Sequence, residues 1–263
     1  MRLDVYLTEN NHIESRTKAK SLIGDSLVMV NGKIITKPSF EVTEEDEVKI
    51  IGNNNPYVSR GGLKLEAAIN NFNLDFKEKV VLDIGASTGG FTDCALQHGA
   101  KLVYAVDVGS DQLHPTLRSN PKVVSMEKTN VKDLGELPNK IDFVVMDVSF
   151  VSIEYLLPFI YKYVMDSNYG FVMLIKPQFE LGHQKLKNGV VKDSKTHLRV
   201  IENIKSELNK YNLGIYNLIP SPILGGDGNK EFLAYVKNGS NDFKIKIWGE
   251  WHCLRNWQSA ILQ

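Results

Sequence analysis

The pattern of apolar and polar residues differs before and after about residue 52. Before this point, short apolar stretches predict two short helices, a β-hairpin and a closing strand over residues 1–51. Asn31-Gly32 carries the hairpin prediction, because this dipeptide adopts the backbone angles that a two-residue hairpin turn needs. From residue 79 onward, longer apolar runs recur at intervals, with helix-compatible segments between several of them.

The later apolar runs predict a buried sheet. They occupy residues 80–82, 102–106, 123–124, 143–146 and 170–175. Each run is apolar at consecutive positions, so both faces of each strand are expected to be buried. Strands of this kind belong to largely parallel sheets that helices cover on both sides. We therefore predict an α/β fold for this part of the chain.

Residues 52–56, Gly-Asn-Asn-Asn-Pro, interrupt both patterns. Three asparagines between glycine and proline sustain neither a helix nor a strand, so this segment predicts a linker. We accordingly predict a first domain over 1–55, with the linker near 52–57, and a second domain over 58–240. Residues 241–263 form a C-terminal tail to which the sequence assigns no role.

Composition favours a soluble globular protein with no overall preference for polyanions. Hydrophobic residues make up 43% of the 263 residues and charged residues 24%, a balance that supports a buried core. The 31 Lys and Arg residues balance the 31 Asp and Glu residues, so nucleic-acid binding would require a local basic patch.

The sequence does not support a metal-binding protein, a disulfide-rich protein or a membrane protein. Two cysteines, Cys94 and Cys253, are too few for a disulfide framework or a cysteine-rich zinc site, and we expect no metal. No apolar run reaches the roughly 18 residues of a membrane span, and the first residues lack the apolar segment of a signal peptide. The expected location is the cytoplasm.

A glycine-containing turn over residues 83–92 follows the first predicted strand of the sheet and opens a helix. Such a strand, turn and helix unit lets the backbone approach a ligand closely at the carboxyl edge of the sheet. The next strand ends in Asp107, 22 residues after Gly85, where a carboxylate can accept hydrogen bonds from ribose hydroxyls. These features predict a site for a cofactor that contains adenosine; the alternative is a turn that merely packs strand on helix.

Two residues of this turn favour S-adenosylmethionine over a dinucleotide. Ser87 stands where dinucleotide-binding turns carry the second glycine, which admits a pyrophosphate. Asp83 would repel a phosphate but suits the ammonium group of a methionine moiety.

Four charged residues are candidates for the chemistry. Asp147 and Lys176 end two of the predicted strands, so they should meet at one edge of the sheet. Glu231 begins a late apolar strand, and Lys64 precedes the sheet in the sequence. Taken singly, each residue has a structural alternative. Asp147 would be a helix cap, Lys176 a solvated strand end, Glu231 a partner of Lys230, and Lys64 a charge on a helix surface.

Together these four residues resemble the Lys-Asp-Lys-Glu tetrad of the FtsJ/RrmJ-like ribose 2′-O-methyltransferases. The chain is also similar to the TlyA family of bacterial rRNA methyltransferases, whose members are also labelled haemolysins. The similarity runs from residue 2 to about 237 and is carried in order by residues 57–65, 83–93, 146–150, 175–180 and 228–232. Residues 2–4, 15–19 and 28–33 resemble the signature of an S4-type RNA-binding domain.

The resemblance implies a Rossmann-like class I methyltransferase with a seven-stranded, mostly parallel sheet, joined to a small α+β S4-like domain. It implies transfer of a methyl group from S-adenosylmethionine to a cytidine ribose of 16S or 23S rRNA, or of both. The implied partner is ribosomal RNA or a ribosomal subunit, and no stable membrane partner is expected.

The resemblance also assigns roles to residues. The catalytic set is Lys64, Asp147, Lys176 and Glu231. The cofactor set is Asp83, Gly85, Ala86, Ser87, Thr88, Gly89, Gly90, Phe91, Asp107, Asn130 and Asp147. The RNA-binding set is Arg2, Arg16, Lys18, Lys20, Lys33 and Arg60.

Lys176 is expected at the reacting hydroxyl, either as a cation beside the forming oxyanion or as a general base. Lys64 and Glu231 would orient the ribose and Lys176, and Asp147 would lie near the methyl donor. Two other functions remain open: a membrane-active haemolysin, and a non-catalytic RNA-binding factor of ribosome assembly. The sequence specifies neither the modified nucleotide nor the oligomeric state.

Overall fold

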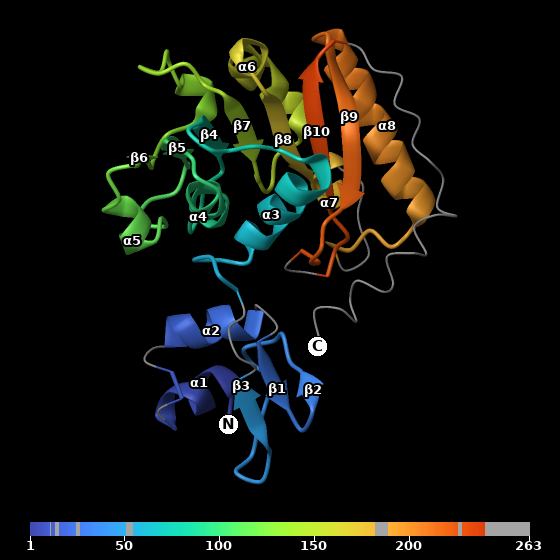
Figure 1. Ribbon diagram of the computed structural model, residues 1–263. Helices are drawn as coiled ribbons and strands as arrows, with labels where there is room; N and C mark the ends of the chain where they lie inside the picture. The colour runs from blue at the N-terminus through green and yellow to red at the C-terminus, as the bar shows by residue number, and fades with distance from the viewer. Residues whose placement is uncertain are drawn as a thin grey trace.

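Two separate sheets organise the chain in the computed structural model (Figure 1). The structure describes residues 1–10, 12–13, 16–24, 27–50, 55–181, 189–225 and 228–239. Residues 52–54 of the linker predicted near 52–57 and the whole predicted tail 241–263 lie outside the described residues, so these two assignments stay predictions. No helix in the described ranges is both long enough and apolar enough to cross a membrane.

The N-terminal unit packs two helices against a three-stranded antiparallel sheet. Its elements are α1 (Leu3–Glu9), α2 (Arg16–Gly24), β1 (Val28–Val30), β2 (Lys33–Ile34) and β3 (Val48–Ile50). The strand order is β2-β1-β3, and Asn31 and Gly32 both take positive φ angles in the β1–β2 turn. Buried side chains from both helices and from β1 form its core. The predicted helices, hairpin and closing strand are thereby confirmed.

The second unit is a seven-stranded sheet with the strand order β6-β5-β4-β7-β8-β10-β9. The strands are β4 (Val80–Ile84), β5 (Leu102–Val106), β6 (Val123–Met126), β7 (Phe143–Met146), β8 (Gly170–Ile175), β9 (Leu213–Pro220) and β10 (Phe232–Asn238). Strands β4 to β8 are parallel, whereas β10 runs antiparallel to both β8 and β9. The prediction of a mostly parallel sheet is confirmed.

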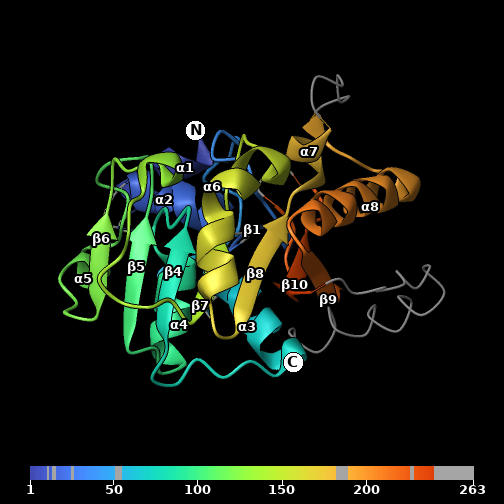
Figure 2. The same cartoon turned by 90° about the horizontal axis from the view of Figure 1, so that it is seen from above.

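Helices cover both faces of this sheet (Figure 2). They are α3 (Gly61–Phe72), α4 (Gly90–Gln97), α5 (Pro115–Arg118), η1 (Val131–Asp133), α6 (Ile153–Asp166), α7 (Pro177–Glu180) and α8 (Ser194–Lys210). Within β4, Leu82 packs into the core beneath α6 and α8, and its neighbour Val81 packs into the core beneath α3 and α4. Successive side chains therefore meet opposite helix layers, which explains why the strands are apolar at consecutive positions.

The order of the strands reverses between β4 and β7, because β5 and β6 lie on one side of β4 while β7 and β8 lie on the other. A crevice opens outside the carboxyl ends of the strands at such a point, which is where ligands bind in open α/β sheets. In Figure 1 the N-terminal unit lies on the side toward which these strands run.

Gly85, directly after β4, allows the turn after β4 to lie close to the main chain of the turn after β7. Its φ angle is +83°, and a Cβ there would lie 2.5 Å from the main-chain oxygen of Asp147. An alanine would therefore have to adopt a strained backbone and push the two turns apart.

We expect Gly85→Ala to lower the free energy of unfolding by about 2–3 kcal/mol. Gly135→Ala is the matched control, because a Cβ at Gly135 meets nothing within 4 Å, and its change should stay within about 0.5 kcal/mol. Urea unfolding of both variants measures the difference. Equal stability of the two variants would contradict the close packing described here.

Candidate active site

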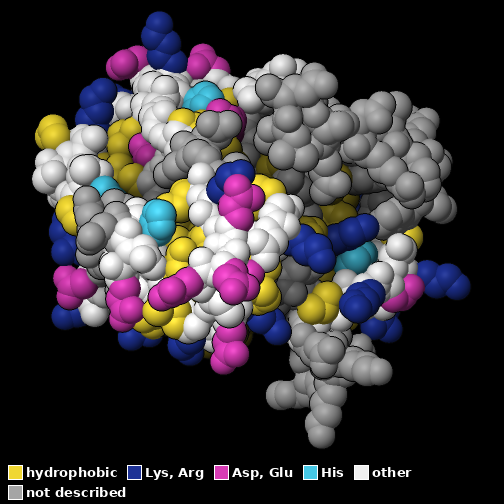
Figure 3. Space-filling view, turned by 90° about the horizontal axis from the view of Figure 1, so that it is seen from below, with side chains coloured by type: hydrophobic (Ala, Val, Ile, Leu, Met, Phe, Trp, Pro, Cys, Tyr) yellow, Lys and Arg dark blue, Asp and Glu magenta, His cyan; other side chains and the backbone are white. Residues whose placement is uncertain are grey.

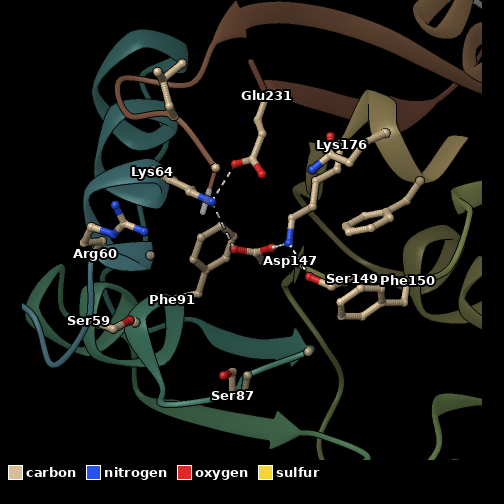
Figure 4. A pocket seen from close by; sticks show the side chains of 18 residues that line it. Ser59, Arg60, Lys64, Ser87, Phe91, Asp147, Ser149, Phe150, Lys176 and Glu231 are labelled. Carbon is tan, nitrogen blue, oxygen red and sulfur yellow. Dashed lines mark hydrogen bonds and ion pairs between the residues drawn. The ribbon is translucent and has the colours of Figure 1, made fainter. Parts of the chain in front are cut away.

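A pocket of about 410 Å³ opens at the carboxyl ends of β4, β7 and β8 (Figure 4). Its lining comes from segments far apart in the sequence: the start of α3, the turn after β4, the loops after β7 and β8, and the turn before β10. The lining residues are Ser59, Arg60, Gly61, Lys64, Gly85, Ala86, Ser87, Gly90, Phe91, Asp147, Ser149, Phe150, Lys176, Gln178, Phe179, Leu224, Gly225 and Glu231.

Four charged side chains of alternating sign form a continuous row in this pocket. The Nζ atom of Lys64 donates a hydrogen bond to Oε2 of Glu231 over 2.7 Å and lies 3.6 Å from Oδ2 of Asp147. The other oxygen of Asp147, Oδ1, lies 2.6 Å from Nζ of Lys176. The structure thus brings together all four residues of the predicted catalytic set.

Because these side chains are largely buried, each charge in the row depends on its neighbours of opposite sign. The exposed fraction is 8% for Lys64, 9% for Lys176 and 3% for Glu231. A charge removed from water is tolerated only when a partner of opposite sign compensates for it, and removal of one partner leaves the other uncompensated. The row therefore holds two cations and two anions that balance one another, and Arg60 adds a further positive charge to the pocket lining.

Local structure brings each member of the row to the pocket. Lys64 projects from the first turns of α3, and Asp147 directly follows β7. Lys176 directly follows β8, and Pro177 then begins α7, so the strand cannot continue. Glu231 precedes β10, the strand that pairs antiparallel with β8, and this pairing places Glu231 at the same sheet edge as Lys176.

The predicted cofactor turn lies along one side of the pocket. Gly85, Ala86, Ser87, Gly90 and Phe91 line it. Thr88 and Gly89 belong to the same turn but do not line the pocket.

Asp107 organises the cofactor turn through backbone contacts. One of its carboxylate oxygens accepts a hydrogen bond from the Ser87 N–H over 2.8 Å, and the other accepts one from the Gly109 N–H over 2.7 Å. Asn130 has a comparable local contact, since its side chain caps η1 by accepting from the Lys132 N–H. Both residues therefore have structural contacts in addition to the ligand contacts predicted for them.

Asp83 lies fully buried beneath the cofactor turn. Its Oδ2 atom accepts a hydrogen bond from the Thr92 hydroxyl over 2.6 Å, whereas its Oδ1 atom has no hydrogen-bond partner among the described residues. Burial raises the pKa of Asp83 to about 7; the Thr92 hydrogen bond opposes this shift, and the charge of Asp147 adds to it. A buried carboxylate oxygen without a partner is suited to a cationic ligand group.

The loop that follows β7 presents residues that the sequence analysis did not single out. Ser149 accepts a hydrogen bond from Lys176 Nζ over 2.8 Å. Phe150, at a φ angle of +65°, is 90% exposed and packs on Phe179 with the ring centroids 4.9 Å apart. The sequence signal was the family similarity over residues 146–150 and 175–180, which included these positions but assigned no role to Ser149, Phe150 or Phe179.

The predicted RNA-binding residues do not form one cluster in the structure. Arg2 and Arg16 both bind the carboxylate of Asp4, which is completely buried, at 2.9 and 3.0 Å. The Arg2 hydrogen bond is the main reason why the pKa of Asp4 falls to about 2, and the Arg16 contact contributes in the same direction. These two arginines therefore stabilise the N-terminal unit as well as presenting charge.

The remaining members of that set differ in position. Lys20 and Lys33 are exposed on the N-terminal unit, and Arg60 lines the pocket of the second unit. Lys18 lies in α2, but its side chain is outside the described part of the structure.

The pocket chemistry fits S-adenosylmethionine better than a nucleotide phosphate. The carboxylate of Asp147 lines the pocket, Asp83 lies buried beneath the turn without lining the pocket, and the turn itself contributes no basic side chain. Within the described ranges, no group of three His, Cys, Asp or Glu residues is arranged to hold a metal ion.

An open sheet of this strand order, with a glycine turn at the reversal point and a buried Lys-Asp-Lys-Glu row, defines the class of Rossmann-like methyltransferases. The chain belongs to the FtsJ-like methyltransferase family, which matches residues 57–238, and residues 1–48 match the S4 domain. S-adenosylmethionine is the methyl donor of this family, so the cofactor prediction is confirmed.

Curated relatives and a solved structure cover most of the chain. Hemolysin A of Brachyspira hyodysenteriae is 41% identical over 89% of this chain and 99% of its own length. The 23S rRNA (cytidine-2′-O)-methyltransferase TlyA of Campylobacter jejuni is 34% identical over 90% of this chain and 100% of its own. A solved Streptococcus thermophilus structure, titled as a hemolysin, is 39% identical with a TM-score of 0.76 and covers 99% of this chain and 98% of that one.

The raised pKa of Asp83 has a consequence for stability. Between about pH 4 and pH 7 the folded ligand-free protein holds a proton on this carboxyl that the unfolded chain has released. The free energy of unfolding should therefore fall as the pH rises through this window, and Asp83→Asn should flatten that fall. Urea unfolding of the two proteins from pH 5 to 8 measures the slopes.

Glu180 contributes a fall of the same sign, because burial raises its pKa to about 7 as well. Asp83→Asn is therefore expected to remove only part of the slope, and a double variant with Glu180→Gln more of it. Asp166→Asn, at the exposed end of α6, is the control. A slope that survives in the double variant would refute this account of both carboxyls.

Proposed function

We propose that this protein transfers a methyl group from S-adenosylmethionine to the 2′-hydroxyl of a cytidine ribose in ribosomal RNA. The observation that carries the proposal is the placement of Lys176 Nζ in the pocket, between the Asp147 carboxylate and the Ser149 hydroxyl. The similarity to the TlyA enzyme of Campylobacter jejuni, whose name specifies a cytidine 2′-oxygen, supports the choice of substrate.

S-adenosylmethionine, when bound, supplies an electrophilic methyl group on a positively charged sulfur. A ribose hydroxyl is a weak nucleophile at neutral pH, so the protein must stabilise the negative charge that develops on its oxygen. A lysine ammonium has three N–H donors; Lys176 donates a hydrogen bond to Ser149 over 2.8 Å and forms an ion pair with Asp147 over 2.6 Å. We assign to one of the other N–H groups a hydrogen bond to the reacting oxygen. In this assignment Lys176 acts electrostatically and not as a general base, and the proton of the ribose hydroxyl is released to solvent water.

The other three members of the row support Lys176. Asp147 pairs with Lys176 through one oxygen and lies near Lys64 through the other, so its carboxylate couples the two cations. Glu231 compensates the charge of Lys64 from the opposite side. We propose that Lys64 and Glu231 orient the ribose, while Asp147 holds Lys176 and faces the methyl donor.

The N-terminal S4 domain is proposed to capture the RNA. Figure 3 views the molecule from below, the side on which Figure 1 shows the N-terminal unit, and basic and acidic side chains both appear on this face. With a net charge of zero for the whole chain, binding must depend on particular cations such as Lys20 and Lys33. An rRNA substrate also supports a cytoplasmic location.

Lys176→Ala should reduce methyl transfer at least about 100-fold, because the developing oxyanion loses its cationic donor. Its affinity for S-adenosylmethionine should stay within twofold of the unaltered protein. Transfer of a radiolabelled methyl group to 30S and 50S subunits, assayed separately, measures the loss and identifies the modified subunit. Lys101→Ala is the control, because Lys101 is an exposed lysine directly before β5. Normal turnover by Lys176→Ala would refute the assignment.

The double variant Lys20→Glu, Lys33→Glu should bind rRNA more weakly, and log K should depend less steeply on log salt concentration because two phosphate contacts are lost. Arg2 and Arg16 are left unchanged, because the buried Asp4 depends on both. Filter binding at several salt concentrations measures the affinity, with Lys101→Glu as the control. Equal affinity of the double variant and this control would contradict RNA capture by this surface.

A further inference from the structure

Ser149 carries a contact in the active site that the four-residue row does not explain. Its hydroxyl accepts a hydrogen bond from Lys176 Nζ over 2.8 Å (Figure 4). Ser149 is itself exposed and lines the pocket, so the hydroxyl contributes little to the hydrophobic core. An exposed side chain that binds a nearly buried lysine suggests a role in the site instead of in stability.

An ion pair alone leaves the direction of the Lys176 ammonium poorly determined. Asp147 is shared, with Oδ1 2.6 Å from Lys176 Nζ and Oδ2 3.6 Å from Lys64 Nζ. Coulomb attraction depends on distance but has little dependence on angle, whereas a hydrogen bond to a hydroxyl is directional. The hydrogen bond to Ser149, together with the ion pair to Asp147, therefore restricts the directions in which the other N–H groups of Lys176 point.

The chain also holds Ser149 in a fixed position relative to Lys176. Both oxygens of Glu180, in α7, accept a hydrogen bond from the Ile153 N–H at the start of α6, at 3.1 and 3.2 Å. Phe150, next to Ser149, packs on Phe179 of α7. The segment after Lys176 and the loop that carries Ser149 are therefore joined at two further points.

We infer that Ser149 is a positioning residue for Lys176: its hydroxyl, together with the Asp147 ion pair, orients the ammonium so that another of its N–H groups faces the substrate oxygen. This inference rests on the proposed function for the identity of that oxygen. It adds to the family tetrad a fifth side chain that acts through Lys176 without touching the reacting atoms.

Ser149→Ala should lower kcat about 10-fold to 100-fold, because a misplaced catalytic group loses rate and not substrate affinity. The KM values for S-adenosylmethionine and for ribosomal subunits should stay within twofold, and the thermal unfolding midpoint should not change. Ser149→Thr keeps the hydroxyl and should recover most of the rate.

Ser152→Ala is the matched control in the same loop. The Ser152 hydroxyl accepts from the Tyr155 N–H and caps α6 without contact to Lys176, so this variant should lose stability but keep kcat. A kcat of Ser149→Ala equal to that of the unaltered protein would overturn the inference. So would a Ser149→Thr variant as slow as Ser149→Ala, since the hydroxyl would then not be the cause.

A second readout does not depend on the RNA substrate. In spectra of ¹⁵N-labelled lysine ammonium groups, the Lys176 signal is identified by its loss in Lys176→Ala. It should be protected from rapid exchange in the unaltered protein and in Ser149→Thr, and broadened or shifted in Ser149→Ala. If the unaltered protein methylates no rRNA, the proposed function fails while this measurement still decides the inference. An unchanged Lys176 signal in Ser149→Ala would overturn it.

Discussion

The shared carboxylate of Asp147 is the interaction on which the site depends. It lies between two lysines that are far apart in the sequence, one before β4 and one after β8. Lys64 also reaches Glu231, so α3, β7, β8 and β10 meet in one row of charges. Because each charge is largely removed from water, no member is stable in this position without its neighbours. The sheet must therefore form with its strand ends in register before the site exists.

The arrangement of the strands explains why such a row is possible. The carboxyl ends of the parallel strands lie at one edge of the sheet, and the antiparallel strand β10 begins at that same edge. Glu231, directly before β10, and Lys176, directly after β8, therefore lie close together. Gly85 lets the turn after β4 approach the main chain of Asp147 without a side chain between them. The cofactor turn and the charged row are thus two sides of one pocket.

Much of this fold could be predicted from the sequence, but the contacts within the site could not. Apolar runs such as 143–146 and 170–175 identified strands because burial on both faces leaves a direct composition signal. Strand β9 (Leu213–Pro220) was not identified, because it is an edge strand in which buried and exposed residues mix. The Lys64 to Glu231 contact spans 167 positions, and family resemblance, not spacing, placed these two residues together. The pairing of Asp4 with Arg2 and Arg16, and the role of Ser149, depend on side-chain directions that no periodicity encodes.

The position of the N-terminal unit constrains the kind of substrate that the pocket can serve. This unit lies on the side toward which the parallel strands run, and the pocket opens at those strand ends (Figure 1). A ligand that contacts both units must extend from one to the other, which a polynucleotide can do and a free nucleoside cannot. The chain as a whole carries no net charge, so general attraction to phosphate contributes little and the two units must share the binding energy. Under the proposed function, the S4 domain would raise the local concentration of RNA at the pocket, and the charged row would act on the ribose that the bound RNA places there.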